Sequence, residues 1–115
     1  MEKLRQTYKN WHGFLPHLPR LARFTLGTKI DALFTDSLEV MLLASYSSKE
    51  QKLLVLQKAS TKLDTLKFFL QTAWELKILD NKKYSLLAEP LVEIGRMLGG
   101  WMNKIKKETP PKGGE

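Results

Sequence analysis

The sequence predicts an all-α fold, an up-down-up-down antiparallel four-helix bundle. Three observations support this prediction. Apolar residues recur three or four positions apart in four segments of the chain, which is the spacing of helical stripes. No segment alternates apolar and polar residues over a useful length, as a half-buried strand would. The connections between the four segments are short, so sequential helices should be antiparallel neighbours.

The length of the chain fits a single domain. Its 115 residues can bury one core but are too few for two. With 43% hydrophobic and 27% charged residues, the composition is that of a globular protein. We expect the bundle to occupy residues 1–107. Residues 108–115 offer no apolar residue to anchor them, so we expect a disordered C-terminal tail.

The first helix is predicted from one apolar stripe. Its members are Leu4, Tyr8, Trp11 and Leu15. Pro16 and Pro19 should kink this helix and then end it, because proline has no backbone amide to donate to the preceding turn.

The second helix is predicted from about Thr25 to Ala44 and should form the centre of the fold. Its apolar residues cover more than half of its circumference, so it should pack against several neighbours. They are Leu26, Ile30, Leu33, Phe34, Leu38, Met41 and Leu42. Asp31, Asp36 and Glu39 have no basic residue among residues 31–48, which predicts a negative strip on this helix.

The third helix is predicted from its cap and its heptad spacing. Ser48 is placed to cap the helix, and Gln51 completes a capping-box pattern. Leu56, Leu63 and Leu70 recur every seven residues, which predicts a packing seam of the bundle type. We expect this helix to run to about Leu79.

The fourth helix is predicted from about Lys82 to Lys107, after turn and cap residues at Asp80 and Asn81. Pro90 should kink it near residues 86–90.

Three glycines, Gly95, Gly99 and Gly100, lie within this last helix although its apolar stripe is continuous. The stripe contains Ile94, Leu98, Trp101, Met102 and Ile105. Each glycine costs roughly 1 kcal/mol of helical preference relative to alanine, which suggests a need for close packing. Gly95 and Gly99 lie one turn apart beside the stripe. We therefore assign Gly95, Gly99, Leu98 and Trp101 to helix packing or an oligomer interface.

Signatures of an enzyme are missing. His12 and His17 are five residues apart with a proline between them, which is not the spacing that places two imidazoles on one metal, so we interpret them as surface or hinge residues. The glycines lack the Gly-Lys-Ser/Thr ending of a phosphate-binding loop. No base stands in a recognisable relation to any serine. We predict no catalytic residue, no metal site and no cofactor.

No membrane partner is expected. The longest apolar run, residues 40–44, is far shorter than the ~20 residues of a membrane span. The N-terminus mixes charged and polar residues, and the chain has no cysteine. A cytoplasmic location is the expectation that follows.

Basic residues are the better lead to a function. The net charge is +7, and the bases gather in residues 1–30, 49–79 and 96–107. The candidate nucleic-acid contacts are Arg20, Arg23, Lys58, Lys62, Lys67, Arg96, Lys104, Lys106 and Lys107. Lysines beside exposed aromatic rings, here Phe68 and Phe69, can bind phosphates while a ring stacks on a base. The alternative is that these rings are core or subunit contacts and the lysines only solubilise the bundle.

Two segments carry a family resemblance. Arg23-Phe24-Thr25-Leu26-Gly27 and Glu93-Ile94-Gly95-Arg96-Met97-Leu98-Gly99-Gly100-Trp101 resemble the accessory variability determinant (Avd) proteins of diversity-generating retroelements. The run Leu66-Lys67-Phe68-Phe69-Leu70 also resembles this family. The likeness covers about residues 8–107, and the wider group includes proteins encoded by intervening sequences of 23S ribosomal RNA genes.

The resemblance implies a homopentamer of four-helix protomers that forms a basic barrel. Such a barrel binds RNA and DNA without strong sequence preference, together with the reverse transcriptase of the retroelement. The complex supports mutagenic copying of a template RNA into complementary DNA, and the accessory protein catalyses nothing. By motif position, Lys67 and Arg96 are the basic contacts that the resemblance implies. The alternative is a relative encoded by a ribosomal intervening sequence, acting as a structural or RNA-associated oligomer.

Overall fold

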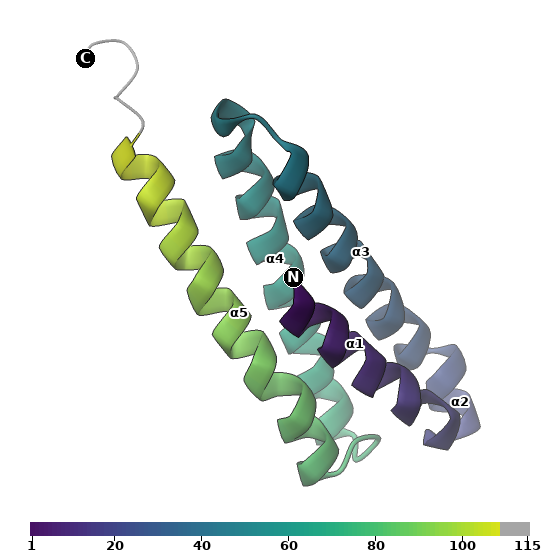
Figure 1. Ribbon diagram of the computed structural model, residues 1–115. Coiled ribbons are helices and arrows are strands. Elements are labelled where there is room, and N and C mark those ends of the chain that lie inside the picture. The colour runs from purple at the N-terminus through teal and green to yellow at the C-terminus, as the bar shows by residue number, and fades with distance from the viewer. Residues whose placement is uncertain (109–115) are drawn as a thin grey trace.

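The computed structural model describes residues 1–108, and all regular structure in this range is helical. The elements are α1 (Glu2–Phe14), the 3-10 helix η1 (Leu15–His17), α2 (Arg20–Phe24), α3 (Leu26–Tyr46), α4 (Lys49–Glu75) and α5 (Asn81–Glu108). Figure 1 shows α1, α3, α4 and α5 packed side by side in an elongated bundle. The predicted all-α fold is confirmed. The predicted tail lies outside the described residues except for Glu108, which instead ends α5.

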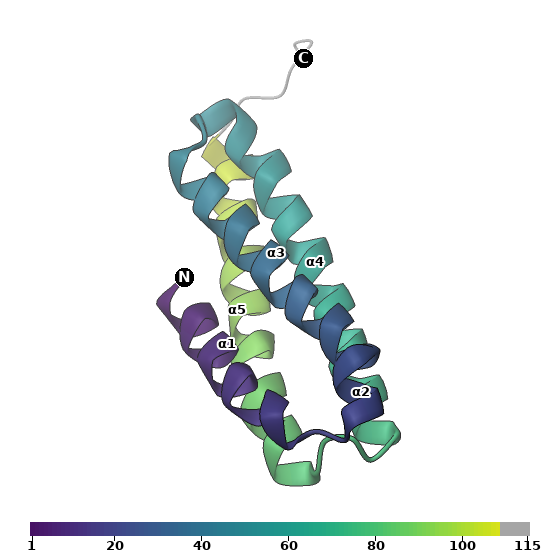
Figure 2. The ribbon, with the colours of Figure 1, turned by 90° about the vertical axis from the view of Figure 1, so that its right-hand side faces the viewer.

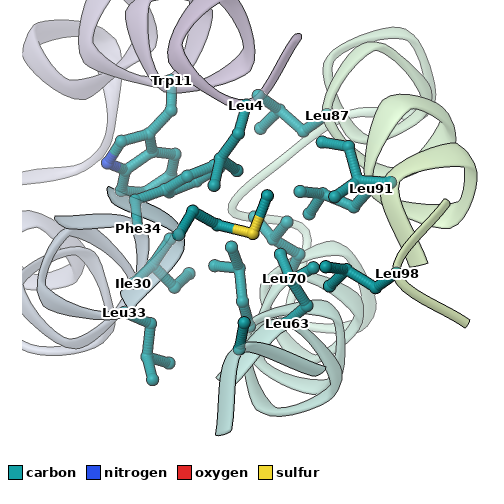
Figure 3. Packing of buried hydrophobic residues seen from close by; sticks show 14 of the residues in the cluster. Leu4, Trp11, Ile30, Leu33, Phe34, Leu63, Leu70, Leu87, Leu91 and Leu98 are labelled. Atoms are coloured by element: carbon teal, nitrogen blue, oxygen red, sulfur yellow. The ribbon is translucent and has the colours of Figure 1, made fainter. Parts of the chain in front are cut away.

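One hydrophobic core lies between the long helices. The rings of Trp11 and Phe34 are stacked, with centroids 6.1 Å apart, and both side chains are fully buried. Leu4 of α1 lies near Leu87 and Leu91 of α5 in the same cluster, as Figure 3 shows. Aromatic stacking and aliphatic packing therefore join α1 to both α3 and α5.

The start of α4 and its seam follow the sequence. The Ser48 hydroxyl accepts a hydrogen bond from the Gln51 amide at 3.3 Å, so the predicted cap is formed. Leu56, Leu63 and Leu70 are at most 2% exposed. The heptad leucines are thus the core face of this helix.

The end of α4 comes earlier than predicted. The helix stops at Glu75 rather than near Leu79, because Lys77 adopts a left-handed conformation with φ of 64°. The chain then turns to Asp80, whose carboxylate accepts the Lys83 amide at 2.8 Å and caps the start of α5. The helix α5 continues without a break through Pro90.

The first part of the chain forms a corner that the sequence did not predict. The helix α1 ends at Phe14, and Pro16 lies in the separate 3-10 helix η1. The short helix α2 and the long helix α3 then meet at Thr25, where the backbone leaves the helical conformation. A Cβ at Gly27 would lie only 3.0 Å from the carbonyl oxygen of Ala22. The corner therefore favours a residue without a side chain at this position.

The helix α1 covers only part of α5. Lys3 pairs with Glu93, and the Lys83 Nζ lies 5.6 Å from the centre of the Phe14 ring. The part of α5 from residue 94 to residue 108 extends beyond these contacts, which is about 15 residues or roughly 22 Å. Figures 1 and 2 show α1 beginning partway along the bundle. One half of the bundle thus has four helices and the other half has three.

Two of the acidic residues behind the predicted negative strip of α3 contact neighbouring helices. Asp31 accepts a hydrogen bond from the Trp11 indole at 3.2 Å. Burial raises the pKa of Tyr8, and the nearby Asp31 carboxylate raises it further. Asp36 pairs with Lys62 of α4 at 3.6 Å. Two of the three carboxylates therefore stabilise contacts between helices.

Within the described range, no helix is long and apolar enough to span a membrane.

Candidate nucleic-acid interface

The candidate basic residues lie in three regions of the bundle. Lys58, Lys62, Lys67 and Arg96 lie on the middle of α4 and α5, Lys104, Lys106 and Lys107 lie at the end of α5, and Arg20 and Arg23 lie on α2. The structure therefore does not bring all nine into one site.

Lys67 lies at the seam between α4 and α5, and Arg96 lies on the exposed surface of α5. The Lys67 Nζ reaches across to α5, where it would lie 3.8 Å from a Cβ at Gly95, the residue before Arg96. Lys67 also pairs with Asp64 at 3.3 Å on its own helix, which offsets part of its charge. Arg96 is exposed, and no carboxylate of residues 1–108 forms an ion pair with it. One cation thus lies at the seam, and the other lies on the solvent-exposed side of α5.

Lys58 and Lys62 differ although they lie one turn apart on α4. Lys62 faces α3 and pairs with Asp36 at 3.6 Å, with both side chains partly exposed. Lys58 is exposed and makes no ion pair with the described part of the chain. Partly exposed ion pairs are weak, so a phosphate could displace Asp36 at low cost.

The neighbouring aromatic rings also differ in their exposure. Phe69 is half-buried and carries the Lys29 Nζ at 5.7 Å from its ring centre. Phe68 is 64% exposed and meets the edge of Phe69, with ring centroids 5.4 Å apart. Phe68 is therefore the ring that a base could reach. The contact of Lys29 with Phe69 depends on the packing of α3 against α4, so residue spacing along one helix does not predict it.

The two arginines of α2 have different surroundings. Arg20 is exposed, whereas Arg23 is partly buried. The Arg23 Nε is buried without a hydrogen-bond partner among residues 1–108. The carbonyl oxygen of Arg23 accepts the Thr28 hydroxyl at 3.1 Å. Arg23 is thus part of the corner between α2 and α3 as well as a source of positive charge.

The end of α5 is basic and exposed. Lys104, Lys106 and Lys107 are all exposed, and the last two lie in the final turn, where cations favourably meet the negative end of the helix dipole. Lys104 also lines a groove together with Lys49 and Lys52 of α4. Lys49 and Lys52 are not among the contacts predicted from the sequence. The sequence feature that could have identified them is a basic residue in each of the first turns of α4. Only the packing of α4 against α5, however, brings them close to Lys104.

The glycines of α5 do not serve close packing within the described chain. A Cβ at Gly99 or Gly100 would have no neighbouring atom within 4 Å. Leu98 is fully buried in the core, and Trp101 is 44% exposed. The assignment of Gly95 and Gly99 to an interface with another chain stays a prediction.

Large apolar side chains are exposed on several helices. The most exposed are Tyr46, Leu21, Phe24, Phe68, Leu76 and Leu54, at 60% or more. Leu21 and Phe24 lie one turn apart on α2, and neighbouring exposed apolar side chains are typical of surfaces that bind another protein.

No group of three or more acidic or histidine side chains in residues 1–108 is placed to hold a metal ion.

Comparison with known proteins gives one match. No curated protein and no solved structure matches the chain. The family model described as bAvd-like matches residues 1–105, which include the corner of α2 and α3 and most of α5. The resemblance inferred from the residues is confirmed, and the chain belongs to the bAvd-like family.

Proposed function

We propose that this chain is the accessory protein of a diversity-generating retroelement. In this proposal it binds template RNA and DNA and the cognate reverse transcriptase, and thereby supports mutagenic synthesis of complementary DNA. It acts in the cytoplasm and catalyses no step itself. The family match over residues 1–105 is the observation that carries the proposal.

The charge of the surface supports nucleic-acid binding. The chain has a net charge of +7, and Arg96 and Lys58 are exposed without ion pairs in the described range. In this proposal Lys67 at the seam of α4 and α5 and Arg96 on the exposed surface of α5 provide the central phosphate contacts. Binding through phosphates releases counterions, so it weakens with salt and depends little on sequence.

The assembly that we propose is a homopentamer of up-down-up-down protomers. Opposite directions of consecutive long helices are supported by the short connections Ser47–Ser48 and Leu76–Asp80. Self-association is supported by the exposure of Leu21 and Phe24 on α2, at 77% and 71%. A closed ring would bury such side chains between subunits.

The test of nucleic-acid binding is a titration of labelled RNA and DNA at increasing salt. We expect the double variant Lys67→Glu and Arg96→Glu to weaken binding at least tenfold. The slope of the logarithm of the binding constant against the logarithm of the salt concentration should also become less steep, by the contribution of about two phosphate contacts. The matched control is Lys9→Glu with Lys82→Glu, which changes the net charge equally at exposed positions on α1 and α5. Circular dichroism should show the same helix content for both variants.

Three results would contradict the proposal. They are binding that does not respond to salt, equal weakening by both double variants, and a strictly monomeric protein in sedimentation experiments. The partnership is tested separately by mixing the purified chain with the reverse transcriptase encoded beside it. Failure of the two to elute together would remove that partner from the proposal.

A further inference from the structure

A groove lies at the three-helix end of the bundle. Its volume is about 500 Å³. It is lined by the end of α3, the start of α4 and the end of α5, together with Met1. The lining residues that matter here are Met41, Ala44, Leu56, Trp101, Lys52 and Lys104.

The groove exists because α1 is shorter than its neighbours. The contact of Lys3 with Glu93 marks the start of α1 along α5, and the remaining part of α5, residues 94–108, has no fourth helix beside it. Figure 2 shows α3, α4 and α5 continuing beyond the N-terminus. The uncovered length would accept a helix of about 15 residues, or roughly 22 Å.

The floor of the groove is apolar. Leu56, Met41 and Ala44 are 2%, 6% and 6% exposed, and Trp101 stands at the side with 44% of its surface exposed. Aliphatic groups offer no hydrogen bonds to the edges of a nucleobase, and a thioether sulfur is only a weak acceptor. Methionine side chains do adapt to the apolar face of a bound helix.

The rim of the groove is positively charged. Lys49, Lys52 and Lys104 line it, and among residues 1–108 Glu108 is the one acidic residue in the lining. Lys49 pairs with Glu108 at 3.2 Å. Lys52 and Lys104 have no carboxylate partner in the part of the chain that the structure describes. An occupant with carboxylates along its edges would complement these two lysines.

We infer that this groove binds an acidic amphipathic helix of a partner protein, which takes the place of the missing fourth helix. The apolar face of that helix packs on Met41, Ala44 and Leu56, and its carboxylates pair with Lys52 and Lys104. A second copy of this chain fits less well, because Asp31 and Asp36 of α3 already contact α1 and α4 and are not available to Lys52 and Lys104. Residues 109–115 do not fit either, since their sequence Thr-Pro-Pro-Lys-Gly-Gly-Glu has no large apolar side chain.

The inference goes beyond the proposed function because it requires no nucleic acid. The probe is a fluorescein-labelled peptide of 15 residues, with leucines on one helical face and glutamates on the other. We expect it to bind the full chain saturably, with the change in fluorescence anisotropy as the readout. Two control peptides have the same leucines in scrambled order, or lysine in place of every glutamate, and neither should bind.

Substitutions inside and outside the groove test where the peptide binds. Lys52→Glu with Lys104→Glu should weaken its binding at least tenfold. Lys58→Glu with Lys82→Glu, which changes the same charge on the same two helices outside the groove lining, should change it less than twofold. Trp101→Ala should weaken it about fivefold, which tests the apolar contact without adding charge. All three should keep the helix content of the parent chain.

Several results would overturn the inference. Absence of peptide binding, or equal binding of the scrambled peptide, would remove the helix as occupant. Displacement of the peptide by single-stranded oligonucleotide, with the groove variants losing oligonucleotide binding, would make the groove a nucleic-acid site. A changed subunit number in the Lys52 and Lys104 variant would make it an interface between copies of this chain. Lys67→Glu with Arg96→Glu should leave peptide binding intact, which separates this inference from the proposed function.

Discussion

The half of the bundle that α1 covers and the half that it leaves open share α3, α4 and α5. In the covered half, Trp11 and Leu4 of α1 fill the space against Phe34 and Leu91, and all four side chains are fully buried. In the open half, Trp101 projects into a groove with 44% of its surface exposed. The same three helices thus form a finished core at one end and an accessible surface at the other (Figure 1).

The two halves are expected to contribute differently to the stability of the fold and to the binding of partners. Burial of large apolar side chains stabilises the covered half, because each fully buried side chain gains both the hydrophobic effect and close packing. The open half has fewer contacts between helices, so it is expected to open locally at lower cost. We therefore expect substitutions in the covered half to change folding, and those in the open half to change binding and assembly.

The largest effect on stability is expected from truncation of Trp11 in the covered half, with Trp101 of the open half as the comparison. Trp11→Ala should lower the free energy of unfolding by about 3–5 kcal/mol, because it leaves a cavity and removes the donor to Asp31. Trp101→Ala should lower it by roughly 1 kcal/mol, because this ring is already partly in water. Urea unfolding followed by circular dichroism measures both. Equal losses would mean that the open half is as important to folding as the covered half.

Two glycine substitutions should have effects of opposite sign. Gly27→Ala should destabilise the fold by about 1 kcal/mol, since the new methyl group would meet the backbone oxygen of Ala22 at 3.0 Å. Gly99→Ala should stabilise an isolated protomer by up to about 1 kcal/mol, because its Cβ meets no neighbour and alanine favours the helix. Thermal unfolding of the two variants at equal subunit number measures the pair.

Substitutions at Gly99 also test whether the open half forms an interface between copies of the chain. If another chain packs on Gly99 in the open half, Gly99→Leu should shift sedimentation toward smaller species while Gly99→Ala has less effect. If the subunit number stays the same in both variants, that position is not an interface. Gly27 variants should leave the subunit number unchanged, because Gly27 is buried at a corner within the protomer.

The sequence predicted the elements with strong local signals. The heptad leucines of α4 and the serine cap at its start are determined by residues close together in the chain, so spacing alone identifies them. The end of α4 was missed because Lys77 adopts a left-handed conformation that usually favours glycine. The short helix α2 was missed because a turn between two helices depends on Gly27 and Ala22 approaching each other in space.

The candidate site was predictable in composition but not in arrangement. Clusters of bases in the sequence located α4 and the end of α5 correctly as basic segments. Which lysines pair with carboxylates depends on contacts between helices, as for Lys62 with Asp36 of α3. The groove depends on where α1 begins along α5, which no local pattern determines. Tertiary packing therefore decides which charges stay available to a partner.

The smallest effect is expected at the boundary between the two halves, where Lys3 meets Glu93. The hydrogen bond with Lys3, followed by its charge, lowers the pKa of Glu93 below its ordinary value of 4.5. A lowered pKa in the folded state means that the pair stabilises the fold above pH 4.5 and loses this contribution as the pH falls through the lowered value. Glu93→Gln should therefore lower the urea midpoint slightly at pH 7 and leave it unchanged at strongly acidic pH. Glu39→Gln is the matched control, because Glu39 is exposed on α3 and makes no ion pair within residues 1–108. An equal response of both variants at the two pH values would show that the pair does not hold α1 to α5.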